Sequence, residues 1–81
     1  YAPDAPVLLV ASLDEAQRLA AATPGAVIVD HGTDLARYAR SLYADLRSAD
    51  ARGATTIIAV LPPAVGLGHA VRDRLAKAAH R

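Results

Sequence analysis

Three short apolar runs, each followed by an amphipathic stretch, constrain the fold of this chain most strongly. The runs cover residues 7–10, 26–30 and 55–61, and apolar side chains recur at helical spacing after each of them. Alternation of this kind predicts an α/β domain with parallel strands. Because the runs are continuously apolar, we expect helices to cover both faces of the sheet. The predicted fold is a small Rossmann-like, three-layer domain with three parallel strands and three helices.

The connections also limit the order of the strands. With right-handed crossovers, the order 1-2-3 would place the first two helices on one face and leave the other face bare. The order 2-1-3 places helices on both faces, and it is the order that we predict. A sheet this small has two edges that need cover.

Length and composition indicate one domain with a thin core. The chain has 81 residues, and the proline-rich residues 1–6 are predicted to end an interdomain linker, with the domain itself over residues 7–81. Hydrophobic residues make up 53% of the chain, but many are alanine, and Phe, Trp and Met are absent. We therefore expect the domain to depend on a partner domain or on a second copy. Because the chain begins with Tyr rather than Met, we interpret it as a fragment.

Charge and cysteine content exclude several classes of function. The formal net charge is +1, which gives no electrostatic footprint for nucleic acid. Without cysteine the chain has no disulfide, thiol nucleophile or cysteine-based zinc site, which is compatible with a cytoplasmic protein. The apolar runs are too short to span a membrane, and no signal-peptide pattern is present.

The stretch LPPAVGLGHAVRDRL places a Gly-x-Gly pair between the third apolar run and a helix. It lacks the lysine and hydroxyl of a Walker A loop and the third glycine of a dinucleotide-binding fingerprint. Glycines ahead of a helix can still expose N–H groups to an anion, and such a site would combine Gly66, Gly68 and His69 with Ser12 and Asp30. The alternative, which we favour, is that the glycines only permit positive φ at a tight turn.

Asp30 and His31 form an acid–imidazole pair in the sequence, which can act as a general base. Adjacent residues at a strand end point in different directions, so we favour a hydrogen-bonded loop pair. His31, His69 and His80 lack the spacing of metal ligands. We predict no catalytic residue and no metal site in this chain.

Charged residues on the predicted helices allow two interpretations. Arg47, Asp50 and Arg74 belong either to solvated helix faces or to an interdomain interface. The thin core favours the interface.

Three stretches together resemble one known family. YAPDAPVLLV is similar to the HYAP-x-x-P segment that ends the linker of Sua5-type threonylcarbamoyl-AMP synthases. LYADLRSAD resembles that family's LYAALRELD helix, and PPAVGLGHAVRDRLAKAA resembles its PPEEGLGxAIxNRLxRAA ending, with Asp73 where Asn is more frequent. The three matches occur in the family's order and cover nearly the whole chain. The chain thus resembles the C-terminal domain of the Sua5/YciO/YrdC/YwlC family.

The resemblance implies a noncatalytic accessory domain of an enzyme of t6A biosynthesis in tRNA. In the full-length enzyme a YrdC-like domain condenses ATP, L-threonine and bicarbonate into threonylcarbamoyl-AMP and pyrophosphate, with ATP and Mg²⁺ as the expected cofactors and none in this fragment. Tyr1 and Pro3 match the linker that lies over the active site like a lid. The implied partner is the YrdC-like domain, and tRNA is reached only through transfer proteins. The alternatives are a nucleotide- or anion-sensing regulatory domain and a self-associating module that forms a homodimer.

Overall fold

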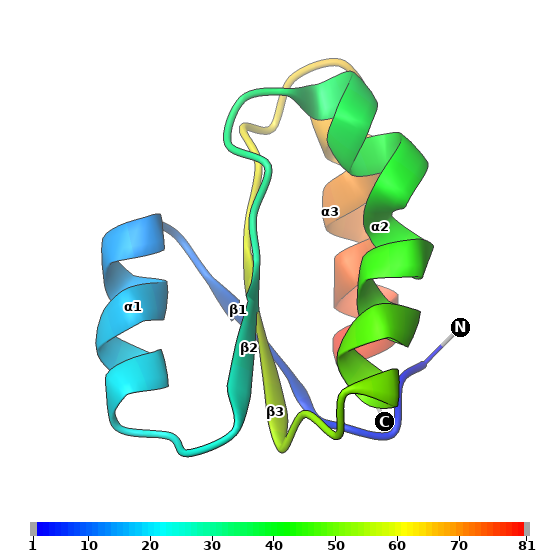
Figure 1. Cartoon of the computed structure of the whole chain (residues 1–81). Coiled ribbons are helices and arrows are strands. Elements are labelled where there is room, and N and C mark those ends of the chain that lie inside the picture. The colour runs from blue at the N-terminus through cyan, green and yellow to red at the C-terminus, as the bar shows by residue number, and fades with distance from the viewer. Residues whose placement is uncertain (1, 81) are drawn as a thin grey trace.

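Strands and helices alternate along the chain, as the sequence predicts. The computed structural model describes residues 2–80, and Tyr1, which we expected to belong to the linker, lies outside these residues. The elements are β1 (Val7–Val10), α1 (Leu13–Ala21), β2 (Ala26–Val29), α2 (Leu35–Ala51), β3 (Thr56–Val60) and α3 (Leu67–Ala79). Figure 1 shows α1 on one face of the sheet and α2 with α3 on the other. The predicted three-layer α/β fold is confirmed.

The three strands are parallel and lie in the order β1-β3-β2, so β3 and not β1 occupies the centre. The argument from crossovers excluded only the order 1-2-3. Any order in which the second connection reverses the direction of the first places α1 and α2 on opposite faces, and both 2-1-3 and 1-3-2 do so. β3 is the longest strand and has four consecutive buried residues, which suits the centre of the sheet.

The core has two unequal layers, one on each face of the sheet. Along β3, Ile57 and Ala59 pack toward α2 and α3, whereas Ile58 and Val60 pack toward α1. The layer under α1 has four buried residues, and Ala16 is the one buried residue that α1 contributes. The layer under α2 and α3 has twelve buried residues and is the main core.

Local hydrogen bonds cap both ends of α2. Asp34 caps its N-terminus by accepting a hydrogen bond from the Arg37 N–H at 3.1 Å. Beyond its C-terminus Gly53 adopts a φ of +75°, which lets the Ala54 N–H return to the Ala49 carbonyl at 3.1 Å. Between these ends, α2 runs from the carboxyl ends of the strands back to the end of the molecule where the chain enters β1 (Figure 1).

Candidate functional site

Ser12 and Asp30 follow β1 and β2 at the carboxyl edge of the sheet, where we expected an anion or nucleotide site. The Ser12 hydroxyl accepts a hydrogen bond from the Glu15 N–H at 3.2 Å and caps α1. The Asp30 carboxylate accepts one from the Gly32 N–H at 2.9 Å. Each side chain thus stabilises its own turn.

The Gly66 loop, residues 61–66, joins β3 to α3 at the same edge. Gly66 is the N-cap of α3, with φ +50° and ψ −127°, so it has the positive φ that we expected. The Gly68 N–H donates to the Val65 carbonyl at 2.8 Å, and the His69 N–H donates to the Gly66 carbonyl at 3.2 Å. Two N–H groups of the first turn of α3 are therefore already hydrogen-bonded to carbonyls of the loop, and anion binding here stays the alternative to the turn that we favour.

Gly68 is required for a different reason from Gly66. The positive φ that we expected at Gly68 is wrong, because Gly68 lies within α3, and an added Cβ would lie 1.8 Å from the Pro63 carbonyl oxygen. The loop is also tied to α3 by Arg72, whose Nε donates to the Pro62 carbonyl at 2.7 Å. The first glycine thus permits a backbone conformation, and the second permits close packing of α3 against the strand exit.

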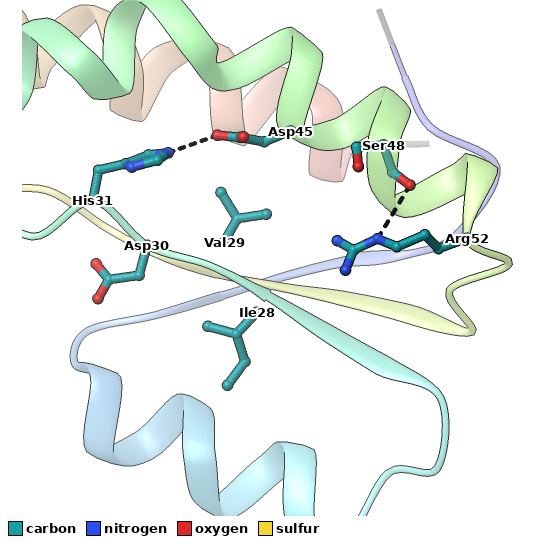
Figure 2. A pocket seen from close by; sticks show the side chains of 7 residues that line it. All are labelled: Ile28, Val29, Asp30, His31, Asp45, Ser48 and Arg52. Atoms are coloured by element: carbon teal, nitrogen blue, oxygen red, sulfur yellow. Dashed lines mark hydrogen bonds and ion pairs between the residues drawn. The ribbon is translucent and has the colours of Figure 1, made fainter.

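A pocket of about 120 Å³ lies between the edge strand β2 and the helix α2 (Figure 2). Its lining includes two carboxylates, one guanidinium group and an imidazole. Its lining residues are Ile28, Val29, Asp30, His31, Asp45, Ser48 and Arg52.

His31 is held by α2 and not by its sequence neighbour Asp30. Its Nε2 lies 2.7 Å from Asp45 Oδ2 and 3.0 Å from the Ser41 hydroxyl. Figure 2 shows the carboxylate of Asp30 pointing away from the imidazole. The two residues diverge at the strand end, so the hydrogen-bonded loop pair of Asp30 and His31 that we favoured is wrong: Asp30 accepts from the Gly32 N–H and His31 pairs with Asp45.

Ser41, His31 and Asp45 do not have the geometry of a catalytic triad. In a triad the serine bonds one imidazole nitrogen and the carboxylate bonds the other. Here Ser41 and Asp45 both approach Nε2, and the Ser41 hydroxyl lies 3.1 Å from Asp45 Oδ2 and 2.9 Å from the Arg37 carbonyl. This cluster fixes the exit of β2 against α2.

Tyr38, on α2, lies in the core and contacts the His31 ring. Its side chain is fully buried, and its hydroxyl donates to the Val60 carbonyl at 2.7 Å, with the Val29 carbonyl at 3.4 Å. Its ring meets the His31 ring edge-on, with centroids 5.0 Å apart. Burial, and secondarily the charges of nearby carboxylates, raises the pKa of the Tyr38 hydroxyl, so it remains a neutral donor. Tyr38 thereby links α2 to the ends of β2 and β3.

Sequence reasoning overlooked the polar residues of α2 and its C-cap that hold His31 or line the pocket. Ser41, Asp45, Ser48 and Arg52 are separated by four, three and four residues, which places them along one face of the helix. This face borders the buried one that contains Leu42 and Leu46. The spacing was a usable signal, but only the structure shows that the exit of β2 lies opposite.

The residues predicted for an interdomain interface fall into two groups. Arg47 on α2 and Arg74 on α3 are exposed. Asp50 is half-buried at the end of α2, where its carboxylate accepts hydrogen bonds from the Asp4 N–H at 3.1 Å and the Ala5 N–H at 3.4 Å.

Residues 2–80 contain no group of three or more His, Cys, Asp or Glu side chains arranged to hold a metal ion. In the same part of the chain no helix combines the length and the apolar character needed to cross a membrane.

Comparison with known proteins identifies the family. The family model for the C-terminal domain of threonylcarbamoyl-AMP synthase matches residues 1–80. No curated protein and no solved structure matches the chain. The match spans the segment before β1, every strand and helix described above, the Gly66 loop and Asp50. The chain therefore belongs to the family of threonylcarbamoyl-AMP synthase C-terminal domains, as the resemblance of its sequence predicts.

Proposed function

We propose that this domain is a noncatalytic accessory unit that docks on the YrdC-like catalytic domain of a threonylcarbamoyl-AMP synthase and anchors the linker over the active site. The supporting observation is the packing of the segment before β1. Pro3 and Ala5 are buried although they precede the first strand. A linker end held in this way has a fixed position relative to the sheet.

The segment before β1 continues the alternation of the strand. Its side chains point by turns into the core and into solvent, with Pro3, Ala5 and Val7 buried and Asp4 and Pro6 exposed. The Pro6 carbonyl accepts a hydrogen bond from the Ile57 N–H at 2.9 Å, so pairing with β3 begins one residue before β1. These contacts support the interpretation of residues 1–6 as the linker end, with residues 3–6 held by the domain in an extended form.

Exposed apolar side chains support the docking part of the proposal. Leu8, Leu13 and Leu19 are 45%, 43% and 36% exposed, and Val65 and Leu67 are 59% and 52% exposed. Covering such side chains with a partner surface stabilises a complex, by about 1 kcal/mol for each leucine, because roughly half of its surface or less is still exposed. The small core under α1 adds to this argument, because a partner domain would extend it.

In this proposal the chemistry takes place on the companion domain. ATP, L-threonine and bicarbonate bind there, Mg²⁺ accompanies ATP, and tRNA is reached only through downstream transfer proteins. The accessory domain contributes by holding the linker in position. It keeps the linker close to the active site, which lowers the entropic cost of closing it over the substrates.

Removal of residues 7–81 from the full-length synthase tests the proposal. We expect slower formation of threonylcarbamoyl-AMP and a lower melting temperature of the remaining catalytic domain, because the linker is released and the docking surface is uncovered. Unchanged kinetics together with unchanged stability would refute the accessory role.

A second candidate function, self-association into a homodimer, is favoured by the open edges of the sheet. Within the described residues β1 and β2 each pair with β3 alone, so each strand leaves one row of backbone groups available. Light scattering on the chain tests it, and a monomeric mass at high concentration would exclude it.

A further inference from the structure

The segment before β1 has few backbone donors with which to hold its position. Pro3 and Pro6 have no N–H group, so Ala2, Asp4 and Ala5 supply the amide donors of residues 2–6. The N–H groups of Asp4 and Ala5 both point to one acceptor, the carboxylate of Asp50, at 3.1 Å and 3.4 Å. One side chain, 45 and 46 residues away in sequence, thus satisfies two successive amides of the segment.

The position of Asp50 in α2 is unfavourable for the helix itself. Asp50 is the penultimate residue of the helix, and its last turn has no basic residue. The negative end of the helix dipole lies there, so a carboxylate is repelled, and aspartate is also a poor helix former. The two amides donate to the carboxylate at 3.1 Å and 3.4 Å, and because a charged acceptor strengthens a hydrogen bond, they offset part of this cost. The residue is therefore better suited to holding the segment than to building the helix.

The bonds from Asp50 also fix the register of the segment. The donors are the backbone N–H groups of Asp4 and Ala5 and not side chains, and the two amides are adjacent in the chain. One bond from the Pro6 carbonyl to the Ile57 N–H then joins the segment to β3. Figure 1 shows this first part of the chain passing beside the C-terminal end of α2 before it enters β1.

We infer that Asp50 is the positioning residue through which the domain holds the end of the linker, an inference that rests on the anchoring role proposed above. Its carboxylate bridges the Asp4 and Ala5 amides, so the path of the linker away from the domain is determined at the end of α2. When this carboxylate is lost, the amides of residues 4 and 5 lose their acceptor and the linker end loosens, while the sheet and helices remain folded, because Asp50 does not belong to either core layer.

Hydrogen exchange on the full-length synthase, read by mass spectrometry on peptides that span residues 2–7, tests the inference. The variants are Asp50→Ala, which removes both acceptor oxygens, and Asp50→Asn, which keeps one and preserves the shape. The matched control is Asp73→Ala on α3, whose carboxylate is exposed and pairs with Lys77 at 3.1 Å. Peptides that cover β3 report whether each variant remains folded.

In Asp50→Ala we expect the amides of residues 4 and 5 to exchange about tenfold faster or more, as for loss of a charge-assisted hydrogen bond. Asp50→Asn should show a smaller acceleration, and Asp73→Ala none. If exchange in β3 also accelerates in Asp50→Ala, the inference is judged from the exchange rates of residues 4 and 5 in Asp50→Asn and in the Asp73→Ala control. Exchange at residues 4 and 5 that is unchanged in both Asp50 variants would overturn the inference.

Formation of threonylcarbamoyl-AMP by the same variants separates this inference from the proposed function. Faster exchange together with slower product formation or a raised KM supports both. Faster exchange with unchanged kinetics keeps Asp50 as the residue that holds the segment and removes the catalytic importance of the anchored linker.

Discussion

Substitution of Gly68 by alanine gives a quantitative test of the Gly66 loop. The added Cβ would lie 1.8 Å from the Pro63 carbonyl oxygen, whereas carbon–oxygen contacts are normally about 3.3 Å or longer, so the loop or helix must move by about 1.5 Å. The same carbonyl accepts a hydrogen bond from the Val65 N–H at 2.9 Å, which such a movement disrupts. Arg72 holds the neighbouring Pro62 carbonyl and resists the shift.

The expected cost of Gly68→Ala follows from three contributions. Overpacking of a filled site costs about 1–3 kcal/mol, and the disrupted hydrogen bond costs about 1 kcal/mol more. The better helix propensity of alanine returns about 1 kcal/mol. The net loss in the free energy of unfolding is about 2 kcal/mol, which lowers the melting temperature of a domain of this size by roughly 8–16 °C.

Thermal unfolding followed by far-UV circular dichroism measures this effect. Gly53→Ala is the control, because Gly53, unlike Gly68, has a positive φ of +75°, and an added Cβ there would meet no atom within 4 Å. Its cost is conformational strain alone, about 1 kcal/mol. If Gly68→Ala melts within a few degrees of the unsubstituted chain, or costs no more than Gly53→Ala, the argument from close packing is refuted.

The remaining predictions concern the β2 exit and the anion hypothesis. Tyr38→Phe should lose about 1–2 kcal/mol in denaturant unfolding, because the buried Val60 carbonyl loses its donor at 2.7 Å without any change in packing volume. Asp45→Ala should destabilise the chain by about 1 kcal/mol and shift the NMR signals of the His31 ring, from whose Nε2 the carboxylate lies 2.7 Å; unchanged signals would contradict this contact. Calorimetric titration with ATP, AMP or pyrophosphate should give no heat at about millimolar ligand, because two N–H groups at the start of α3 are already bonded within the loop. Measurable heat would favour the sensing alternative.

The fold class was predictable because the hydrophobic pattern of this chain is regular. Each apolar run became a strand and each amphipathic stretch a helix. The strand in the centre of the sheet was not determined by the same argument, since the rule on crossovers accepts two orders. The length and burial of β3 were the further signal, because a central strand needs apolar side chains on both faces over its whole length.

Side-chain roles were harder to predict than the fold because they depend on contacts between distant parts of the chain. The sequence treats Gly66 and Gly68 alike, but one adopts a positive φ and the other meets a carbonyl. Asp50 was predicted as an interdomain interface residue from its place on a charged helix. Its hydrogen bonds to residues 4 and 5 required the fold to bring the end of α2 beside the start of the chain.

The rate of threonylcarbamoyl-AMP formation in three forms of the full-length synthase tests the central claim most directly. The forms are the intact enzyme, one that lacks residues 7–81 but keeps the linker, and one that lacks residues 1–81. If the domain acts by anchoring the linker, a linker whose end is free is nearly as ineffective as one whose end is removed, and both shortened enzymes should be slowed to a similar degree. A shortened enzyme that keeps residues 1–6 and the full rate of the intact synthase would contradict this account.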